Sequence, residues 1–230
     1  AAAAAAAAEA GDFRVQPVGG GDRRRVVDFL RQFFFKDEPL NVDVQLLGAD
    51  GADRCLELEE YSTGCLDEGL SVAAINASTG QLVGVCLNGL DEPGHLPEME
   101  AKVAGCKNTK FRKILGLLAS VEQGADIFTR FPDVRKVLEV RIMSVDASWR
   151  GRGIAKALLD RSRELAKEKG FDMLRVDCTS HFSARAVERL GMTCVHTLPY
   201  ARHLGEDGEP VFRPAPPHAE VKTYVERLGQ

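Results

Sequence analysis

The sequence contains no long apolar run, few aromatic residues and no surplus of positive charge. No stretch of its 230 residues reaches the roughly 18 consecutive apolar residues that a membrane-spanning helix requires. Lysines and arginines number 30 against 34 aspartates and glutamates, so the charge balance does not attract nucleic acid or anionic lipid. We therefore expect neither a nucleic acid nor a membrane as a partner.

Cysteine is present, but not in a pattern that indicates disulfides or a metal site. The six cysteines are Cys55, Cys65, Cys86, Cys106, Cys178 and Cys194, with no Cys-x-x-Cys pair among them. Four of the five histidines, His95 among them, have no partner at a useful spacing. We expect free structural thiols, no bound metal and a cytoplasmic location.

The remaining composition is that of an ordinary globular domain, with 44% hydrophobic and 28% charged residues. Residues 1–10 differ, because the first eight are all alanine. The run lacks the basic start and leucine-rich core of a secretory signal. We expect residues 1–10 to be an alanine-rich leader or tag remnant and residues 11–230 to form one domain.

The spacing of apolar residues predicts strands alternating with helices. Strands are expected at residues 13–18, 70–76, 81–87, 137–145, 173–178, 194–200 and 221–225. Helices are expected between Asp22 and Pro39 and at residues 54–66, 110–128, 152–169 and 183–190, with a loop at 91–97. An antiparallel hairpin followed by strand–helix–strand–helix–strand predicts a single α/β domain, whose mixed, mostly antiparallel central sheet is flanked by helices.

The turn between the strand at 137–145 and the following helix carries two glycines. Gly151 and Gly153 allow the backbone to approach a bound anion, and the free N–H groups of the helix start would point toward it. The chain has no GxxxxGK[ST] phosphate loop, and Lys156 stands where a Rossmann fingerprint requires glycine or alanine. On its own the turn fits either a phosphate-binding loop or a tight turn without a ligand.

Arg150, Gly153 and Ala155 match the pattern Gln/Arg-x-x-Gly-x-Gly/Ala, which resembles the coenzyme A pyrophosphate loop of the GNAT acetyltransferase superfamily. The order of predicted elements around the loop is also similar to that superfamily. The resemblance implies a GNAT fold with acetyl-CoA as co-substrate and no metal. It assigns acetyl-CoA binding to Met143, Ser144, Val145, Arg150, Gly151, Arg152, Gly153, Ile154, Ala155, Lys156 and Ser180. A backbone N–H among the first three would stabilise the oxyanion.

Three further segments resemble arthropod arylalkylamine (dopamine-type) N-acetyltransferases. They are residues 34–41, 179–185 and 211–218. By this resemblance Glu38 is the general base that takes a proton from the amine. The hydroxyls of Ser183 and Thr179 would serve the departing thiolate.

The site departs from the related patterns at two positions. Thr179 stands where the arthropod family has serine, and Val187 stands where many GNAT enzymes have tyrosine. Asp37 is expected to raise the pKa of Glu38 by like-charge repulsion. On the residues alone, the favoured interpretation of Glu38 is a solvated acid at a helix end, and a helix N-cap is an alternative role for Ser183.

The resemblance implies N-acetylation of small aralkylamines, the class of dopamine, serotonin, tyramine and octopamine, by a monomer. Transfer would be direct within a ternary complex, because no cysteine is placed to carry the acetyl group. One alternative is a GNAT enzyme for polyamines, amino acids or protein amines; an acidic rather than aromatic acceptor cleft would favour polyamines. The other is a non-catalytic coenzyme A-binding module.

Overall fold

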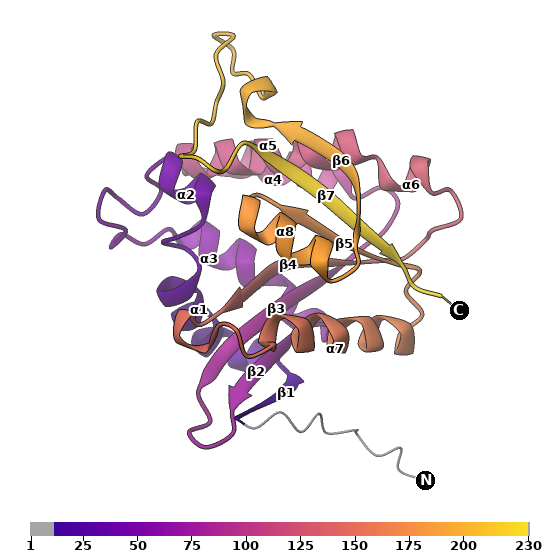
Figure 1. Ribbon diagram of the computed structural model, residues 1–230. Coiled ribbons are helices and arrows are strands. Elements are labelled where there is room, and N and C mark those ends of the chain that lie inside the picture. Colours follow the sequence, from indigo (N-terminus) through magenta and orange to yellow (C-terminus); the bar gives the residue numbers. More distant parts are fainter. Residues whose placement is uncertain (1–11, 230) are drawn as a thin grey trace.

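The computed structural model describes residues 12–229 and contains one seven-stranded sheet with the strand order β1-β2-β3-β4-β5-β7-β6 (Figure 1). Neighbouring strands are antiparallel except for β4 and β5, which run parallel. The strands are β1 (Phe13–Pro17), β2 (Val72–Asn76), β3 (Leu82–Asp91), β4 (Val137–Val145), β5 (Met173–Cys178), β6 (Thr193–Pro199) and β7 (Glu220–Arg227). The expected mixed, mostly antiparallel α/β sheet is confirmed.

Helices cover both faces of the sheet (Figure 1). They are α1 (Arg23–Phe33), α2 (Pro39–Asp43), α3 (Leu56–Thr63), α4 (Leu96–Gly105), α5 (Thr109–Ala125), α6 (Ile127–Arg130), α7 (Ile154–Glu168) and α8 (His181–Arg189). Short 3-10 turns lie at Gly20–Asp22, Gly64–Glu68, Ala147–Trp149 and Tyr200–Arg202. Within residues 12–229, no helix is both long and apolar enough to span a membrane.

Side chains that alternate along the strands fill a separate core on each face of the sheet, and a third, smaller cluster contains Ile127, Val137 and Met173. In β2, Ala73 and Ile75 join the core beneath α1, α3 and α5, whereas Val72 and Ala74 join the core beneath α7 and α8. The sheet is therefore buried on both faces, and this explains why β2 consists almost entirely of apolar residues.

The two parallel strands remain paired over only part of their length. β4 and β5 pair from Val137 to Val140 and from Met173 to Val176. Beyond this point β4 stays with β3 and β5 stays with β7. In the described chain, no strand pairs with the β5-facing edge of β4 over residues 141–145. The sheet is therefore split at its centre.

Two predicted helix boundaries are wrong. Pro39 does not end the first helix, which stops at Phe33; it opens α2, where the missing N–H of proline leaves no hydrogen bond unmade. Asp126 adopts a left-handed conformation with φ of 42° and divides the helix predicted at 110–128 into α5 and α6.

A third difference concerns the segment before α5. Helix α4 was not predicted, and its first residues, Leu96 and Pro97, lie in the segment expected to be a loop. Met99 is the buried residue of this helix, so its sequence lacks a regular apolar stripe. The signal that identified the longer helices is therefore absent here.

The packing of β3 against α7 gives a stability test. A Cβ added at Gly84 would lie 2.9 Å from Ile154 Cγ2, 3.2 Å from Leu158 Cδ1 and 3.3 Å from the Ser144 carbonyl oxygen. We expect Gly84→Ala to lower the free energy of unfolding by about 1–3 kcal/mol through overpacking. Gly116 in α5 has nothing within 4 Å of an added Cβ, so Gly116→Ala should stabilise by about 0.5–1 kcal/mol. Urea unfolding compares the two variants; equal effects would contradict the packing.

Candidate active site

A cavity of about 170 Å³ lies where β4 and β5 separate. Its walls come from these two strands, from α5 and from the segment between α1 and α3. The apolar lining is Phe34, Leu40, Leu58, Tyr61, Met99, Phe111, Ile114, Leu118, Val140, Ile142, Met143, Val176 and Val187. The ionisable lining is Glu38, Glu122, Glu139, Asp177, Arg141 and His95, with Tyr61 and Cys178. The cavity therefore combines an apolar wall with several carboxylates.

Glu38 lies in the wall of this cavity at the start of α2. It is the N-cap residue, and its Oε2 accepts a hydrogen bond from the Asn41 backbone N–H at 2.8 Å. Its Oε1 accepts a hydrogen bond from the Thr179 hydroxyl, also at 2.8 Å. The carboxylate is therefore fixed between a helix start and the end of β5.

Burial of the carboxyl group raises the pKa of Glu38 above its ordinary value. The hydrogen bonds from Asn41 and Thr179 act in the opposite direction, because they stabilise the charged form. The predicted role of Asp37 is wrong: that side chain is exposed and does not contribute to the shift. The interpretation of Glu38 as a solvated acid is also wrong, since the group lines a cavity.

Thr179 and Ser183 line the same cavity from the other side. The Thr179 carbonyl accepts a hydrogen bond from the Tyr200 hydroxyl at 2.5 Å, which fixes the backbone beside the catalytic candidate. The Ser183 hydroxyl donates to the Ser180 carbonyl at 3.0 Å. Ser180, not Ser183, is the N-cap of α8, because its Oγ accepts from the Ser183 N–H.

The residues at the end of β4 differ in their surroundings. Met143 lines the cavity. Ser144 is buried, and its hydroxyl donates to the Phe33 carbonyl at 3.2 Å, so this side chain ties β4 to the end of α1. Val145 is partly buried. Of the three predicted residues, only Met143 has its side chain in the cavity wall.

The glycine turn follows β4 at the start of α7 and does not line the cavity. Gly151 and Gly153 have φ angles of 77° and 78°, in the left-handed region that favours glycine. Gly153 is the N-cap of α7, and no side chain of the described residues caps this helix start. The first N–H groups of α7, from Ile154 onward, are therefore available to an anion.

The basic side chains of the turn differ in their partners. Arg150 is exposed. Arg152 pairs with Asp12 at 2.9 Å and lies over the Trp149 ring, with its guanidinium carbon 4.5 Å from the ring centroid. The other two predicted residues lie on the first turn of α7: Ala155 is partly buried, and Lys156 is exposed and pairs with Asp160 at 2.5 Å.

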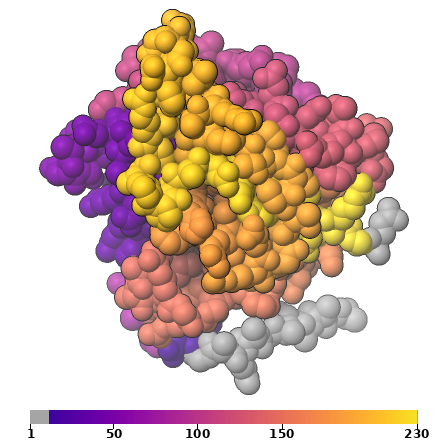
Figure 2. All heavy atoms as spheres, turned by 45° about the horizontal axis from the view of Figure 1, so that its top comes forward, coloured from indigo at the N-terminus to yellow at the C-terminus, as the bar shows by residue number. Residues whose placement is uncertain are grey.

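The third segment that resembles the arthropod enzymes packs beside α2. The C-terminal loop, orange to yellow in Figure 2, lies against the purple segment that contains α2. The Arg213 backbone N–H donates to the Asp43 carboxylate at 2.9 Å, and Phe212 is buried. The loop therefore supports the helix that begins at Glu38.

The sequence did not identify some of the residues that line the cavity. His95 was expected to have no partner, yet its Nδ1 lies 3.5 Å from the Asp91 carboxylate, four residues earlier. The expectation that no cysteine is placed to carry the acetyl group bears most directly on Cys178, because this residue lines the cavity beside Thr179. Burial raises the pKa of the Cys178 thiol to about 12, which keeps it protonated. All six cysteines are free.

Residues 56–192, more than half of the chain, match the family model described as Acetyltransferase (GNAT) family. The chain belongs to this family. The split between β4 and β5 and the glycine turn both lie within the matched residues. Acetyl-CoA is the co-substrate with which this fold works.

Solved structures of arthropod enzymes resemble this GNAT domain over nearly its whole length. Arylalkylamine N-acetyltransferase 2 from Aedes aegypti is 34% identical with a TM-score of 0.87, covering 95% of this chain and 100% of its own. A mosquito arylalkylamine N-acetyltransferase like 5b is 28% identical with a TM-score of 0.85, covering 94% and 100%. The Drosophila melanogaster polyamine N-acetyltransferase, which forms N-acetylagmatine, is 30% identical with a TM-score of 0.84, covering 94% and 100%.

The contact between Thr179 and Glu38 gives a direct electrostatic test. Replacing Thr179 by the similarly shaped valine removes a hydrogen bond that stabilises the charged carboxylate. We expect the pKa of Glu38 to rise further in Thr179→Val. An NMR titration of the glutamate carboxyl carbons measures this, and an unchanged or lower pKa would show that the hydrogen bond does not form.

Proposed function

We propose that this chain catalyses acetyl-CoA-dependent N-acetylation of small primary amines, with aralkylamines as acceptors, by direct transfer within a ternary complex. The observation that carries the proposal is the position of the Glu38 carboxylate in a cavity with an apolar wall, where the pKa of this group is raised. The enzymes that resemble this chain support it, since their names describe acetyl transfer to arylalkylamines or to a polyamine.

Glu38 would act as the general base. An aralkylamine is mostly protonated at neutral pH, and only its free amine can attack the thioester. A carboxylate with a raised pKa is a stronger base than an exposed glutamate. The apolar walls beside Glu38, among them Phe34 and Phe111, would hold the body of the amine.

The separated edge of β4 would stabilise the oxyanion formed at the thioester carbonyl. The backbone N–H groups of Met143 and Val145 point to that side of β4 and have no strand partner there within residues 12–229, whereas the Ser144 N–H faces β3. Donors held rigidly in a sheet need little reorganisation as negative charge develops. Thr179 lines the same cavity, so the thioester would lie between the N–H donors of β4 and the Thr179 hydroxyl.

Thr179 would transfer the proton that the departing thiolate needs. Its hydroxyl donates a hydrogen bond to Glu38, so a proton can pass directly between the two side chains. The acceptor ammonium loses two protons in all. Glu38 takes one, Thr179 gives its own proton to the sulfur as the C–S bond breaks, Glu38 returns a proton to Thr179, and the other ammonium proton passes to solvent. The Ser183 hydroxyl, now bonded to the Ser180 carbonyl, is the second donor on this wall.

The glycine turn would hold the pyrophosphate of acetyl-CoA. The free N–H groups at the start of α7 and the side chains of Arg150, Arg152 and Lys156 supply donors and positive charge. Ser180 at the start of α8 would complete the cofactor side of the cleft.

Two of the other acceptor classes, amino acids and protein amines, fit the cavity less well. Its carboxylates, at Glu38, Glu122, Glu139 and Asp177, would repel the carboxylate of an amino acid. A volume of about 170 Å³ is small for a peptide segment. A coenzyme A-binding module without activity would have no use for the hydrogen bond that joins Thr179 to Glu38.

Replacing the proposed base tests this mechanism. Glu38→Gln should lower kcat by about a hundredfold or more while leaving acetyl-CoA affinity unchanged. In the wild type, kcat/KM should fall as the pH drops through the pKa of Glu38, because protonation removes the base; the variant should lose this acid limb. Asp37→Asn, next in sequence but exposed, is the control and should keep kcat near that of the wild type. Wild-type kcat in Glu38→Gln across the pH range would refute the assignment.

A matched pair of glycines tests the phosphate-binding turn. Gly153 before α7 and Gly170 after it have φ angles of 78° and 72°, so valine causes similar backbone strain at both. We expect Gly153→Val to weaken acetyl-CoA binding about tenfold or more, and Gly170→Val to leave the affinity unchanged. Calorimetry with the folded variants measures this. Equal affinities would contradict phosphate binding at the turn.

A further inference from the structure

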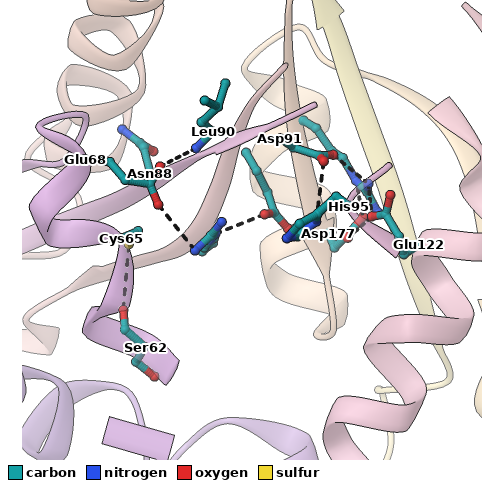
Figure 3. Close-up of polar contacts among 12 residues, drawn as sticks. Ser62, Cys65, Glu68, Asn88, Leu90, Asp91, His95, Glu122 and Asp177 are labelled. Carbon is teal, nitrogen blue, oxygen red and sulfur yellow. Dashed lines mark hydrogen bonds and ion pairs between the residues drawn. The ribbon is translucent and has the colours of Figure 1, made fainter. Parts of the chain in front are cut away.

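The closed end of the cavity, where β4 and β5 are still paired, carries a cluster of charged side chains. Glu139 on β4 lies opposite Arg175 on β5. Figure 3 shows Asp91, His95, Glu122 and Asp177 turned toward one another around this point. These residues come from different elements, so only the fold brings them together.

Negative charge exceeds positive charge in this cluster. Its carboxylates are Asp91, Glu122, Glu139 and Asp177; its guanidinium groups are Arg141 and Arg175. Four carboxyl groups thus face two permanent positive charges, although Asp91, whose pKa is raised to about 8, is mostly protonated at neutral pH. Such an excess in a buried place favours binding of a further cation.

Arg175 forms ion pairs with carboxylates of the protein itself. Its side chain is 1% exposed, pairs with Asp177 at 2.8 Å and with Glu122, and lies 3.6 Å from Asp91. Asp177 also accepts a hydrogen bond from Thr223 at 2.6 Å. Both oxygens of Asp177 are therefore in use.

Glu122 and Glu139, by contrast, keep an oxygen available to the cavity. Their contacts to Arg175 and Arg141 use Oε2 in each case. Within residues 12–229, Oε1 of neither residue has a hydrogen-bond partner. Both side chains line the cavity, so these two oxygens face the space that the acceptor would occupy.

Asp91 is a second, independent sign that the cluster lacks a donor. Its side chain is 1% exposed, and neither carboxylate oxygen has a hydrogen-bond partner in the described chain. The nearest basic side-chain atoms are His95 Nδ1 at 3.5 Å and an Arg175 nitrogen at 3.6 Å. Burial and the charges of Glu122 and Glu139 raise the pKa of Asp91 to about 8. A cation in the cavity would relieve this repulsion.

We propose that the closed end of the acceptor cavity is a cation subsite, in which Glu122 and Glu139 bind a second ammonium or guanidinium group of the acceptor. The inference rests on the proposed function, because the same cavity must present the reacting amine to Glu38. Asp177 lies near the end of β5 and Thr179 directly after it, so about 7 Å of extended chain separates these two residues. Short diamines and guanidinoalkylamines would span this distance, with their methylene chains along the apolar wall.

The test compares a dicationic with a monocationic acceptor. The wild type should acetylate agmatine and putrescine as well as 2-phenylethylamine. In Glu139→Gln, and in Glu122→Gln, the ratio of kcat/KM for agmatine to kcat/KM for 2-phenylethylamine should fall about tenfold or more, since a charge-assisted hydrogen bond is lost. Glu98→Gln is the control: its side chain is 72% exposed and outside the cavity, so the ratio should not change.

The outcomes distinguish the subsite from the activity itself. Acetylation of 2-phenylethylamine but not of agmatine, or an unchanged ratio in folded Glu139→Gln, would overturn the subsite and leave the proposed function standing. If no amine is acetylated, the proposed function fails. Calorimetry of agmatine with the coenzyme A-loaded protein then decides the subsite: binding that weakens in Glu139→Gln supports it, and no binding by the wild type overturns it. Glu139→Gln leaves the contacts of buried Arg175 in place, so it is the safer variant for folding.

Discussion

The separation of β4 from β5 is the constraint on which the rest of the structure depends. The strands pair for four residues and then diverge, each held by its outer neighbour. A separated strand edge leaves backbone groups that need partners from outside the sheet. The same divergence creates the cavity, places Met143 and Thr179 on its opposite walls and directs the end of β4 into the glycine turn before α7. A split sheet thus provides both a space for the amine and an anchor for the cofactor.

The candidate base reaches this split sheet from a distant part of the chain and is tied to both strands. Glu38 hydrogen-bonds to Thr179 at the end of β5. The Ser144 hydroxyl on β4 donates to the Phe33 carbonyl at the end of α1, a few residues before the base. A carboxylate held in this way stays in place although burial disfavours its charge. The surrounding fold thus holds the Glu38 carboxylate in a buried position that is unfavourable for its charge.

Local patterns in the sequence predicted the strands, the glycine turn and the positions of Glu38, Thr179 and Ser183, because each depends on neighbours in sequence or on a family resemblance. The pKa argument from Asp37 failed since adjacent residues point in different directions, and Asp37 faces solvent. The charged end of the cavity was not predictable either: Asp91, Glu122 and Glu139 come from separate elements and meet only after folding. Cys178 is a buried free thiol that also lines the cavity, and periodicity cannot distinguish a core position from a cavity wall.

The central claim is that one cleft holds acetyl-CoA and the amine at the same time. Initial-velocity measurements that vary acetyl-CoA and 2-phenylethylamine together test it most directly. Direct transfer predicts lines that intersect in double-reciprocal plots, because both substrates must be bound before acetyl moves, and Cys178→Ala should give the same pattern. Parallel lines would contradict the account, since they would require an acetylated enzyme to form before the amine binds.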